Sequence, residues 1–196
     1  MQPGFFFGYG SLVNRGTHGY TDAHPAQLSG WRRAWRKTTL REVAYLTAVP
    51  DTTAQIDGLV AGVPGADWAA LDARERAYMR VPARHQVHTH LPEDADLVVF
   101  AIEDGQHQNP DAVSPVLLSY IDVVVQGYLH VFGEDGVERF FDTTTGWDAP
   151  ILDDRRRPLY PRHQKLKRKE TALVNDMLDR VGAKVQPVST FSPLRD

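Results

Sequence analysis

The sequence predicts one α+β domain, with four to six strands around a central element and helices outside. Short apolar runs with strand patterns alternate with helical patterns along most of the 196 residues. Neither an internal repeat nor a low-complexity linker divides the chain. The composition, 42% hydrophobic and 24% charged, is that of an ordinary globular protein with one sizeable core. We therefore assign residues 1–182 to a single domain and residues 183–196 to a loosely attached C-terminal tail.

The predicted strands begin with an aromatic run at residues 5–7 that glycines bound on both sides. Residues 26–38 contain two tryptophans and Gly30, which suit a long strand better than a helix. The next two strands cover residues 43–49 and 55–63 and are separated by a turn at residues 50–53. The last two strands cover residues 84–91 and 97–102 and follow a helix.

Four segments have helical patterns. Residues 66–80 are rich in helix-forming residues and follow a Pro-Gly pair. Ser114 and Pro115 suit the N-cap and first position of a second helix, which we expect to stop at Gly133. The other two helices are predicted over residues 136–143 and 165–181.

One carboxylate lies where the helix at residues 66–80 should be apolar. The face that should be buried carries Trp68, Leu71, Glu75, Tyr78 and, beside them, Met79. The arginines of this segment fall mostly on the other side; they are Arg74, Arg76 and Arg80. Burial raises the pKa of a carboxyl group, which suits a general acid–base catalyst near neutral pH. The alternative is that Glu75 forms a structural ion pair with a nearby arginine.

The first strand turns abruptly into Gly8-Tyr9-Gly10-Ser11-Leu12. The two glycines permit positive φ angles and allow a ligand to approach the backbone closely. The exposed N–H groups of such a turn can bind an anion. An ordinary glycine turn is the alternative, and a phosphate loop is excluded because no Lys-Ser/Thr pair follows.

Several classes of site are not expected. The chain has no cysteine, so it has neither disulfides nor a thiol nucleophile. It has no apolar run long enough to cross a membrane, and its N-terminus does not resemble a signal peptide, so we expect a cytoplasmic protein. His88 and His90 share a strand face as in metal-binding pairs, but no third ligand is near them in the sequence, so we predict no metal.

The charges are unevenly distributed although the net charge is only −3. Residues 93–154 contain fourteen acids and one base, whereas residues 155–169 contain eight bases and no acid. Such a basic run is usually a solvated face or a clamp for an acidic group. Nucleic-acid binding is the alternative, but neither an aromatic ladder nor a known motif accompanies the run, and we expect no nucleic-acid partner.

Two of these stretches together resemble the γ-glutamylcyclotransferase superfamily, which includes γ-glutamylcyclotransferase, the glutathione-degrading ChaC enzymes and the AIG2-like proteins. Residues 7–12 resemble its YGSL-type loop, and Leu71-Asp72-Ala73-Arg74-Glu75 resembles its LD-x-x-E helix. Further similar segments begin at Gly30, Ile56 and Ser114. The resemblance covers roughly residues 4–130, and the two main motifs are specific only as an ordered pair.

The resemblance implies a small mixed β-barrel flanked by helices, and it implies roles. Glu75 is the general acid/base, and no metal or organic cofactor is required. The substrate-binding residues are Tyr9, Gly10, Ser11, Leu12, Tyr78 and Tyr120. The implied enzyme, of the transferase or lyase type, cyclises a small γ-glutamyl peptide or amine, such as a compound of glutathione metabolism. It forms 5-oxoproline and releases the amine.

The sequence departs from the ChaC pattern after the predicted catalytic helix. Residues 146–162 take the place of a glycine turn, so the pocket for the leaving group differs. Arg157 and Arg162 are candidates for binding a substrate carboxylate. Two alternatives to the cyclotransferase remain: a non-catalytic protein that binds a small acid on the same fold, and a lyase that acts on a neutral or carrier-linked γ-glutamyl amine.

Overall fold

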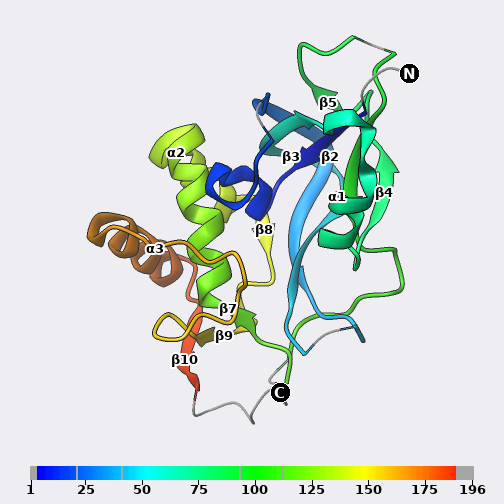
Figure 1. Cartoon of the computed structure of the whole chain (residues 1–196). Coiled ribbons are helices and arrows are strands. Elements are labelled where there is room, and N and C mark those ends of the chain that lie inside the picture. Colours follow the sequence, from blue (N-terminus) through cyan, green and yellow to red (C-terminus); the bar gives the residue numbers. More distant parts are fainter. Residues whose placement is uncertain (1–3, 21, 41, 93, 112, 189–196) are drawn as a thin grey trace.

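The computed structural model describes residues 4–20, 22–40, 42–92, 94–111 and 113–188 (Figure 1). Its strands are β1 (Phe5–Gly8), β2 (His24–Arg36), β3 (Tyr45–Gly62), β4 (Met79–Pro82), β5 (Val87–His88), β6 (Leu97–Ala101), β7 (Val116–Leu117), β8 (Thr144–Thr145), β9 (Pro150–Asp153) and β10 (Lys184–Pro187). Its α-helices are α1 (Trp68–Arg74), α2 (Leu118–Asp142) and α3 (Arg168–Arg180). Short 3-10 helices cover η1 (Ser11–Val13), η2 (Arg15–Thr17) and η3 (Pro64–Ala66).

The main sheet is mixed and has the strand order β4-β6-β1-β3-β2-β5, with β8 paired to β2. Strand β1 lies in its middle, parallel to β6 and antiparallel to β3. Its aromatic residues Phe6 and Phe7 are buried, as the glycine-bounded apolar run predicts. The predicted class, α+β with a small mixed β-sheet structure flanked by helices, is therefore confirmed.

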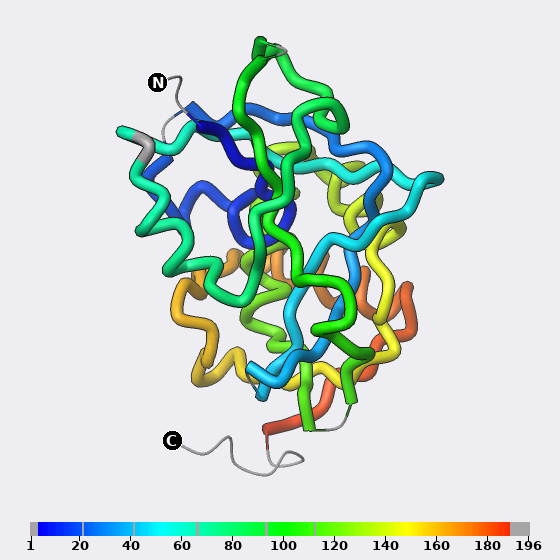
Figure 2. Tube along the Cα trace, turned by 90° about the vertical axis from the view of Figure 1, so that its right-hand side faces the viewer, coloured from blue at the N-terminus to red at the C-terminus, as the bar shows by residue number. Residues whose placement is uncertain are grey.

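Strands β2 and β3 form a long antiparallel ribbon that extends along the molecule (Figure 2). The prediction of two strands separated by a turn at residues 50–53 is wrong, because β3 continues through this segment with Pro50 opposite Trp31. A proline is tolerated there because β1 pairs only with residues 59–62 of β3. At Pro50, the edge of β3 that faces away from β2 has no partner strand, so the missing N–H group of the proline costs no ladder hydrogen bond there.

Helix α2 lies between the main sheet and α3 (Figure 1). It begins at Leu118, after the short strand β7, so the expected N-cap at Ser114 is wrong. Gly133 interrupts it with a φ of 71°, and helical structure resumes and continues to Asp142. This interruption agrees with the two helices predicted on either side of Gly133.

A second sheet of three strands, β10-β9-β7, lies below α2 and α3 (Figure 1). Lys184–Pro187, expected in a loosely attached tail, instead form β10, which pairs in parallel with β9. The rest of that predicted tail, residues 189–196, lies outside the described residues.

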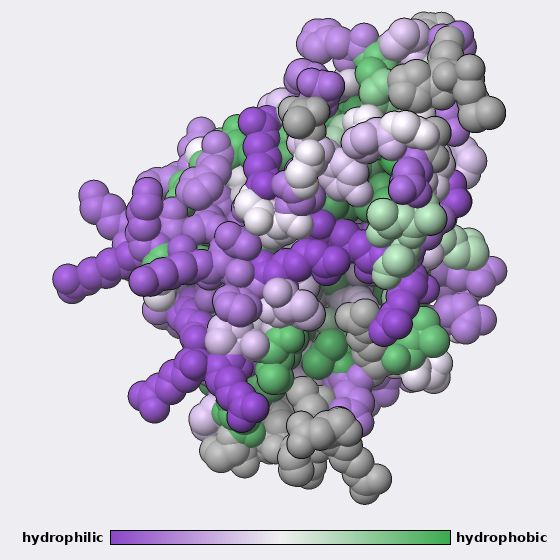
Figure 3. Space-filling view, in the orientation of Figure 1, coloured by the Kyte–Doolittle hydropathy of each residue, from purple (hydrophilic) through white to green (hydrophobic). Residues whose placement is uncertain are grey.

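The outward surface of α3 is strongly hydrophilic, and on the face shown in Figure 3 the apolar surface lies in separate small patches. On its inner side α3 buries Val174, Met177 and Leu178. None of the described helices is long and apolar enough to span a membrane.

Candidate active site

The site is built around the connection from β1 to η1, residues 8–12. Glycine is required here by close packing, because a Cβ atom on Gly8 would lie 2.6 Å from Leu12 Cβ. A Cβ atom on Gly10 would lie 2.6 Å from the Tyr120 hydroxyl oxygen. The two glycines do not use the positive φ angles that they permit, since the positive φ angles of the described glycines occur elsewhere and Gly10 has a φ of −112°.

Buried polar groups hold this connection in place. The Tyr9 hydroxyl donates to the Phe100 carbonyl at 2.5 Å and accepts the Ala48 N–H at 2.9 Å. The Tyr128 hydroxyl of α2 lies 2.9 Å from the Tyr9 carbonyl oxygen. Because its hydroxyl is already bonded on both sides, the Tyr9 side chain supports the loop. A ligand would meet the loop through the other groups of residues 9–12.

The chain turns sharply at Glu75. The prediction of one helix over residues 66–80 is wrong, because α1 ends at Arg74 and Glu75 is its C-cap. The Glu75 carbonyl accepts the Tyr78 N–H at 2.7 Å, and β4 starts one residue later. Leu71 is fully buried and anchors the helix, whereas Met79, expected on the buried face, is 46% exposed. The helix end thus places the carboxylate of Glu75 beside the β1–η1 connection.

Arg74 is the site residue that sequence periodicity missed. Its Nε lies 3.2 Å from Glu75 Oε1, and its side chain is only 8% exposed. The same guanidinium donates to the Thr17 carbonyl at 2.9 Å, to Thr17 Oγ1 at 3.1 Å and to Ser11 Oγ at 3.2 Å. The ion pair of Glu75 with an arginine, one of the two predicted alternatives, is therefore present. It also connects Glu75 to the glycine-containing loop.

Two partly buried tyrosines, Tyr78 and Tyr120, complete the wall around Glu75. Burial raises the pKa of Tyr78 and of Tyr120 well above the usual value, and the negative charge of Glu75 acts in the same direction. Both hydroxyls are therefore neutral at physiological pH. Tyr78 donates to the Leu46 carbonyl at 2.9 Å, whereas the backbone of Ser11 partly offsets the rise in the pKa of Tyr120.

Glu75 lines two adjoining cavities. The inner cavity, of about 30 Å³, is bounded by residues 7–12 and Phe100. The outer cavity, of about 410 Å³, extends from Glu75 past Tyr45 to Leu159 and Arg162. Ser11, Leu46, Glu75, Tyr78 and Tyr120 border both. The structure thus brings Ser11, Glu75, Tyr78 and Tyr120 together at one place, with Tyr9, Gly10 and Leu12 around the inner cavity.

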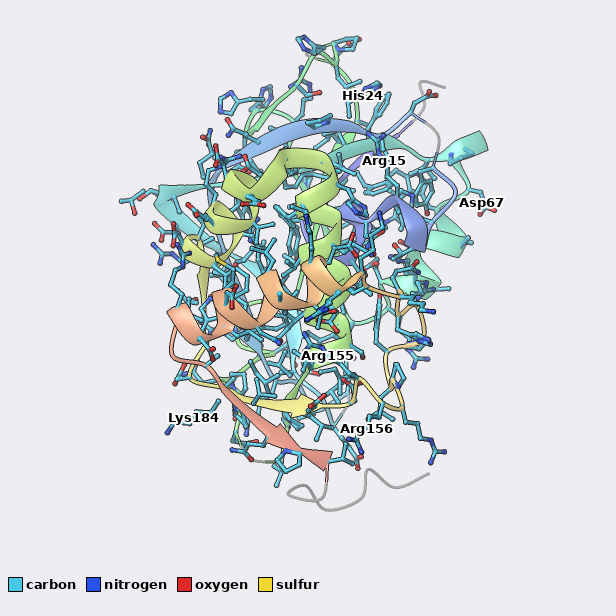
Figure 4. All side chains as sticks on the ribbon, turned by 90° about the vertical axis from the view of Figure 1, so that its left-hand side faces the viewer. Arg15, His24, Asp67, Arg155, Arg156 and Lys184 are labelled. Carbon is cyan, nitrogen blue, oxygen red and sulfur yellow. The ribbon has the colours of Figure 1, made fainter. Side chains whose placement is uncertain are left out.

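The basic segment at residues 155–169 contributes one arginine to the outer cavity, Arg162. Arg157, the other predicted anion-binding candidate, is exposed and does not border it. Arg155 lies beside α3 (Figure 4) and binds both carboxylate oxygens of Asp122, at 2.7 and 2.8 Å. This ion pair fixes the segment to α2, so Arg155 has a structural role.

Asp154 fixes the same segment to the first turn of α2. Its carboxylate accepts the Ser119 N–H at 2.8 Å, the Ser119 hydroxyl at 2.6 Å and the Leu159 N–H at 2.8 Å. One buried carboxylate thus satisfies a donor at the helix start and positions the wall of the outer cavity.

The predicted histidine pair does not border these cavities. His88 lies on β5 with its Nε2 2.8 Å from Ser29 Oγ. Among the described residues, no group of three or more His, Cys, Asp or Glu side chains is placed to hold a metal ion.

No protein-family model matches this chain, and no curated protein matches it by sequence. Similar solved structures share its fold at low identity. A structure described as gamma-glutamyl cyclotransferase is 12% identical, with a TM-score of 0.55 over 89% of this chain and 99% of that one. A human protein described as uncharacterized gives the same values. YkqA from Bacillus subtilis is 16% identical with a TM-score of 0.56 over 71% of this chain, which spans about half (53%) of that protein.

These similarities are similarities of fold, and they agree with the resemblance carried by residues 7–12 and 71–75. The chain has the γ-glutamylcyclotransferase-like fold.

Proposed function

We propose that this protein is a γ-glutamyl cyclotransferase in which Glu75 is the general acid/base. The observation that carries the proposal is the position of Glu75, whose side chain is 15% exposed and borders both cavities beside residues 9–12. A carboxylate at the junction of a narrow and a wide cavity can face a γ-glutamyl group on one side and its leaving amine on the other. The solved structure described as gamma-glutamyl cyclotransferase, which has this fold, supports the choice of reaction.

The two cavities differ in what they can hold. The inner cavity has room for only a few atoms, so we assign it the α-carboxylate of the γ-glutamyl group, against the backbone of residues 9–12. The guanidinium of Arg74 borders the outer cavity and adds positive charge next to residues 9–12 through its hydrogen bond to Ser11 Oγ. The γ-amide and the leaving amine then extend into the outer cavity.

Glu75 takes a proton from the α-ammonium group, and the freed amine attacks the γ-carbonyl carbon of the same molecule. A nitrogen–carbon bond forms, the bond from that carbon to the leaving nitrogen breaks, and the ring closes as 5-oxoproline. The attacking nitrogen loses two protons, one to Glu75 and one to solvent. The leaving nitrogen gains two protons, one from Glu75 and one from solvent. Holding the folded conformer supplies proximity, and proton transfer adds about 10²–10⁴-fold.

Tyr120 is the hydroxyl best placed to stabilise the developing oxyanion. Tyr78 already donates its proton to the Leu46 carbonyl, whereas the Tyr120 hydroxyl lies against Gly10 where Tyr120 borders both cavities. Because the pKa of Tyr120 is raised, its hydroxyl proton remains on the oxygen at physiological pH.

The test is 5-oxoproline release from glutathione, γ-glutamyl-alanine and γ-glutamyl-lysine by the wild type, Glu75→Gln and Glu134→Gln. Glu134 is exposed on α2 and serves as the matched control. We expect product from at least one substrate, a loss of about 10²–10⁴-fold in Glu75→Gln, and wild-type rates in the control. Product formed equally well by Glu75→Gln would refute the role of Glu75. If no substrate reacts while 5-oxoproline raises the melting temperature, the protein is a small-acid binder.

The cytoplasmic location expected from the sequence stays a prediction.

A further inference from the structure

We propose that the leaving amine is bulky and apolar, with an aromatic or branched side chain, as in a γ-glutamyl-phenylalanine. This inference rests on the proposed function and names its substrate class. It is carried by the walls of the outer cavity, which extend well beyond the space that a γ-glutamyl group would fill beside Glu75.

The walls of the outer cavity beyond Glu75 are mainly aromatic and aliphatic. Strand β3 and the turn before β4 contribute Tyr45 and Tyr78, whose rings meet edge to face with centroids 5.8 Å apart. Helix α2 and the segment after β9 contribute Tyr120 and Tyr160, whose centroids are 4.9 Å apart at 88°. Leu159 covers the outer side and is 43% exposed. A third ring placed among these edges and faces would make favourable aromatic contacts.

The volume of the outer cavity supports a large leaving group. At about 410 Å³, it lies in the range of sites that enclose whole small molecules. A glycine or alanine leaving group would leave much of this apolar surface in contact with water. An aromatic side chain would displace that water and bury apolar area, which favours binding in proportion to the area covered.

Charge plays a smaller part at this end of the cavity. Arg162 borders the outer cavity but is exposed, and the exposed Glu42 borders it too. Solvent and salt weaken the attraction of a ligand carboxylate to such an arginine. The apolar body of the amine should therefore determine selectivity more than its carboxylate does.

The aromatic wall is held in place before any ligand binds. The Asp154 carboxylate accepts the Leu159 N–H, and the Tyr160 N–H donates to Ser119 Oγ at 3.4 Å. The first contact reaches the start of α2 through Asp154, which also binds Ser119, and the second reaches Ser119 directly. Tyr120 lies at the same helix start. The cavity is thus preformed, which reduces the entropy that binding must offset.

The experiment compares kcat/KM for 5-oxoproline release from γ-glutamyl-phenylalanine, γ-glutamyl-phenethylamine, γ-glutamyl-glycine and glutathione. We expect both phenyl compounds to exceed γ-glutamyl-glycine and glutathione by about tenfold or more. In Leu159→Ala and in Tyr160→Ala the ratio of phenylalanine to glycine substrate should fall several-fold. Arg157→Ala, outside the cavity, should leave the ratio unchanged. The ratio is measured within each variant, so a partly unfolded sample does not distort it.

Three results would overturn the inference. Equal kcat/KM for γ-glutamyl-glycine and γ-glutamyl-phenylalanine would show that the apolar wall does not select the amine. A ratio that is unchanged in both Leu159→Ala and Tyr160→Ala would show that the preference arises elsewhere. Absence of 5-oxoproline from every substrate would overturn the proposed function itself. The first two results differ from this one because in both of them 5-oxoproline is still formed.

Discussion

Replacing Arg74 by leucine removes one side chain that connects three parts of the site. The guanidinium is nearly buried, forms an ion pair with Glu75 and donates three hydrogen bonds to Ser11 and Thr17. Leucine retains much of the apolar stem but leaves these acceptors without their donor. Because hydrogen bonds to a charged group are not additive, we expect a total loss of about 2–4 kcal/mol in the free energy of unfolding.

Urea denaturation measures this loss directly. With a slope of about 2–3 kcal/mol per molar urea, the midpoint should fall by about 1 M while the slope stays constant. Arg76→Leu is the matched control, because Arg76 is exposed and two residues away; its free energy of unfolding should change by less than about 0.5 kcal/mol. Arg74→Lys keeps the charge but not the planar fork, so it should lie between the wild type and Arg74→Leu.

Activity provides the second measurement on the same variants. Since Arg74 positions Glu75 against the loop at residues 9–12, Arg74→Leu should lower kcat/KM for the best γ-glutamyl substrate by about 10–100-fold. An Arg74→Leu protein with the wild-type urea midpoint and wild-type kcat/KM would refute the reasoning that this guanidinium organises the site.

Three other predictions test the surroundings of the site. Gly10→Ala places a Cβ atom 2.6 Å from the Tyr120 hydroxyl and should raise KM severalfold. Gly19→Ala is the control, because no atom lies within 4 Å of its Cβ position, and it should leave KM unchanged. Equal KM values for the two variants would show that the close packing at Gly10 does not matter for binding. Asp154→Asn replaces one of the two carboxylate oxygens by an NH₂ group, which must face the N–H donor of either Ser119 or Leu159. It should therefore lower the free energy of unfolding by about 1–3 kcal/mol in urea titrations, and no loss would contradict the role assigned to Asp154. Burial raises the pKa of Glu170, but hydrogen bonds from Lys167, Gln126 and His130 outweigh it, and the net pKa is lowered. The ionised Glu170 carboxylate therefore stabilises the folded protein above the ordinary carboxyl pKa, and this stabilisation is lost as the pH falls from there through the lowered pKa of Glu170. The difference in unfolding free energy between wild type and Glu170→Gln should shrink over that acid range, and a difference independent of pH would contradict this sign.

Local sequence patterns identified the elements that carry the loop and the carboxylate. The glycine-bounded run at residues 5–7 predicted β1, and the order of residues 7–12 and 71–75 pointed to the right fold. The same patterns gave the wrong length for the helix that carries Glu75. Good helix formers continue to residue 80, but the Tyr78 hydroxyl bonds to Leu46 of β3, and this contact draws the chain into β4. Tertiary hydrogen bonding here overrides helix propensity.

Arg74 shows why the full site could not be predicted. Periodicity places it on the solvent side of a helix continuing to residue 80, and only the end of α1 at that residue lets its side chain turn toward Thr17 and Ser11. The basic run at residues 155–169 likewise suggested an anion site as a whole. Its partner Asp122 lies on a different element, so the sequence alone could not show that Arg155 is committed to an ion pair while Arg162 faces the cavity.

The most direct test of the central claim is the rate of 5-oxoproline release by wild-type protein and by Glu75→Gln, each shown to be folded by the same urea midpoint. If Glu75 is the general acid/base, the wild type forms product from a γ-glutamyl substrate, and the rate of the variant is lower by about 10²–10⁴-fold. Equal rates from the two folded proteins would contradict this role of Glu75.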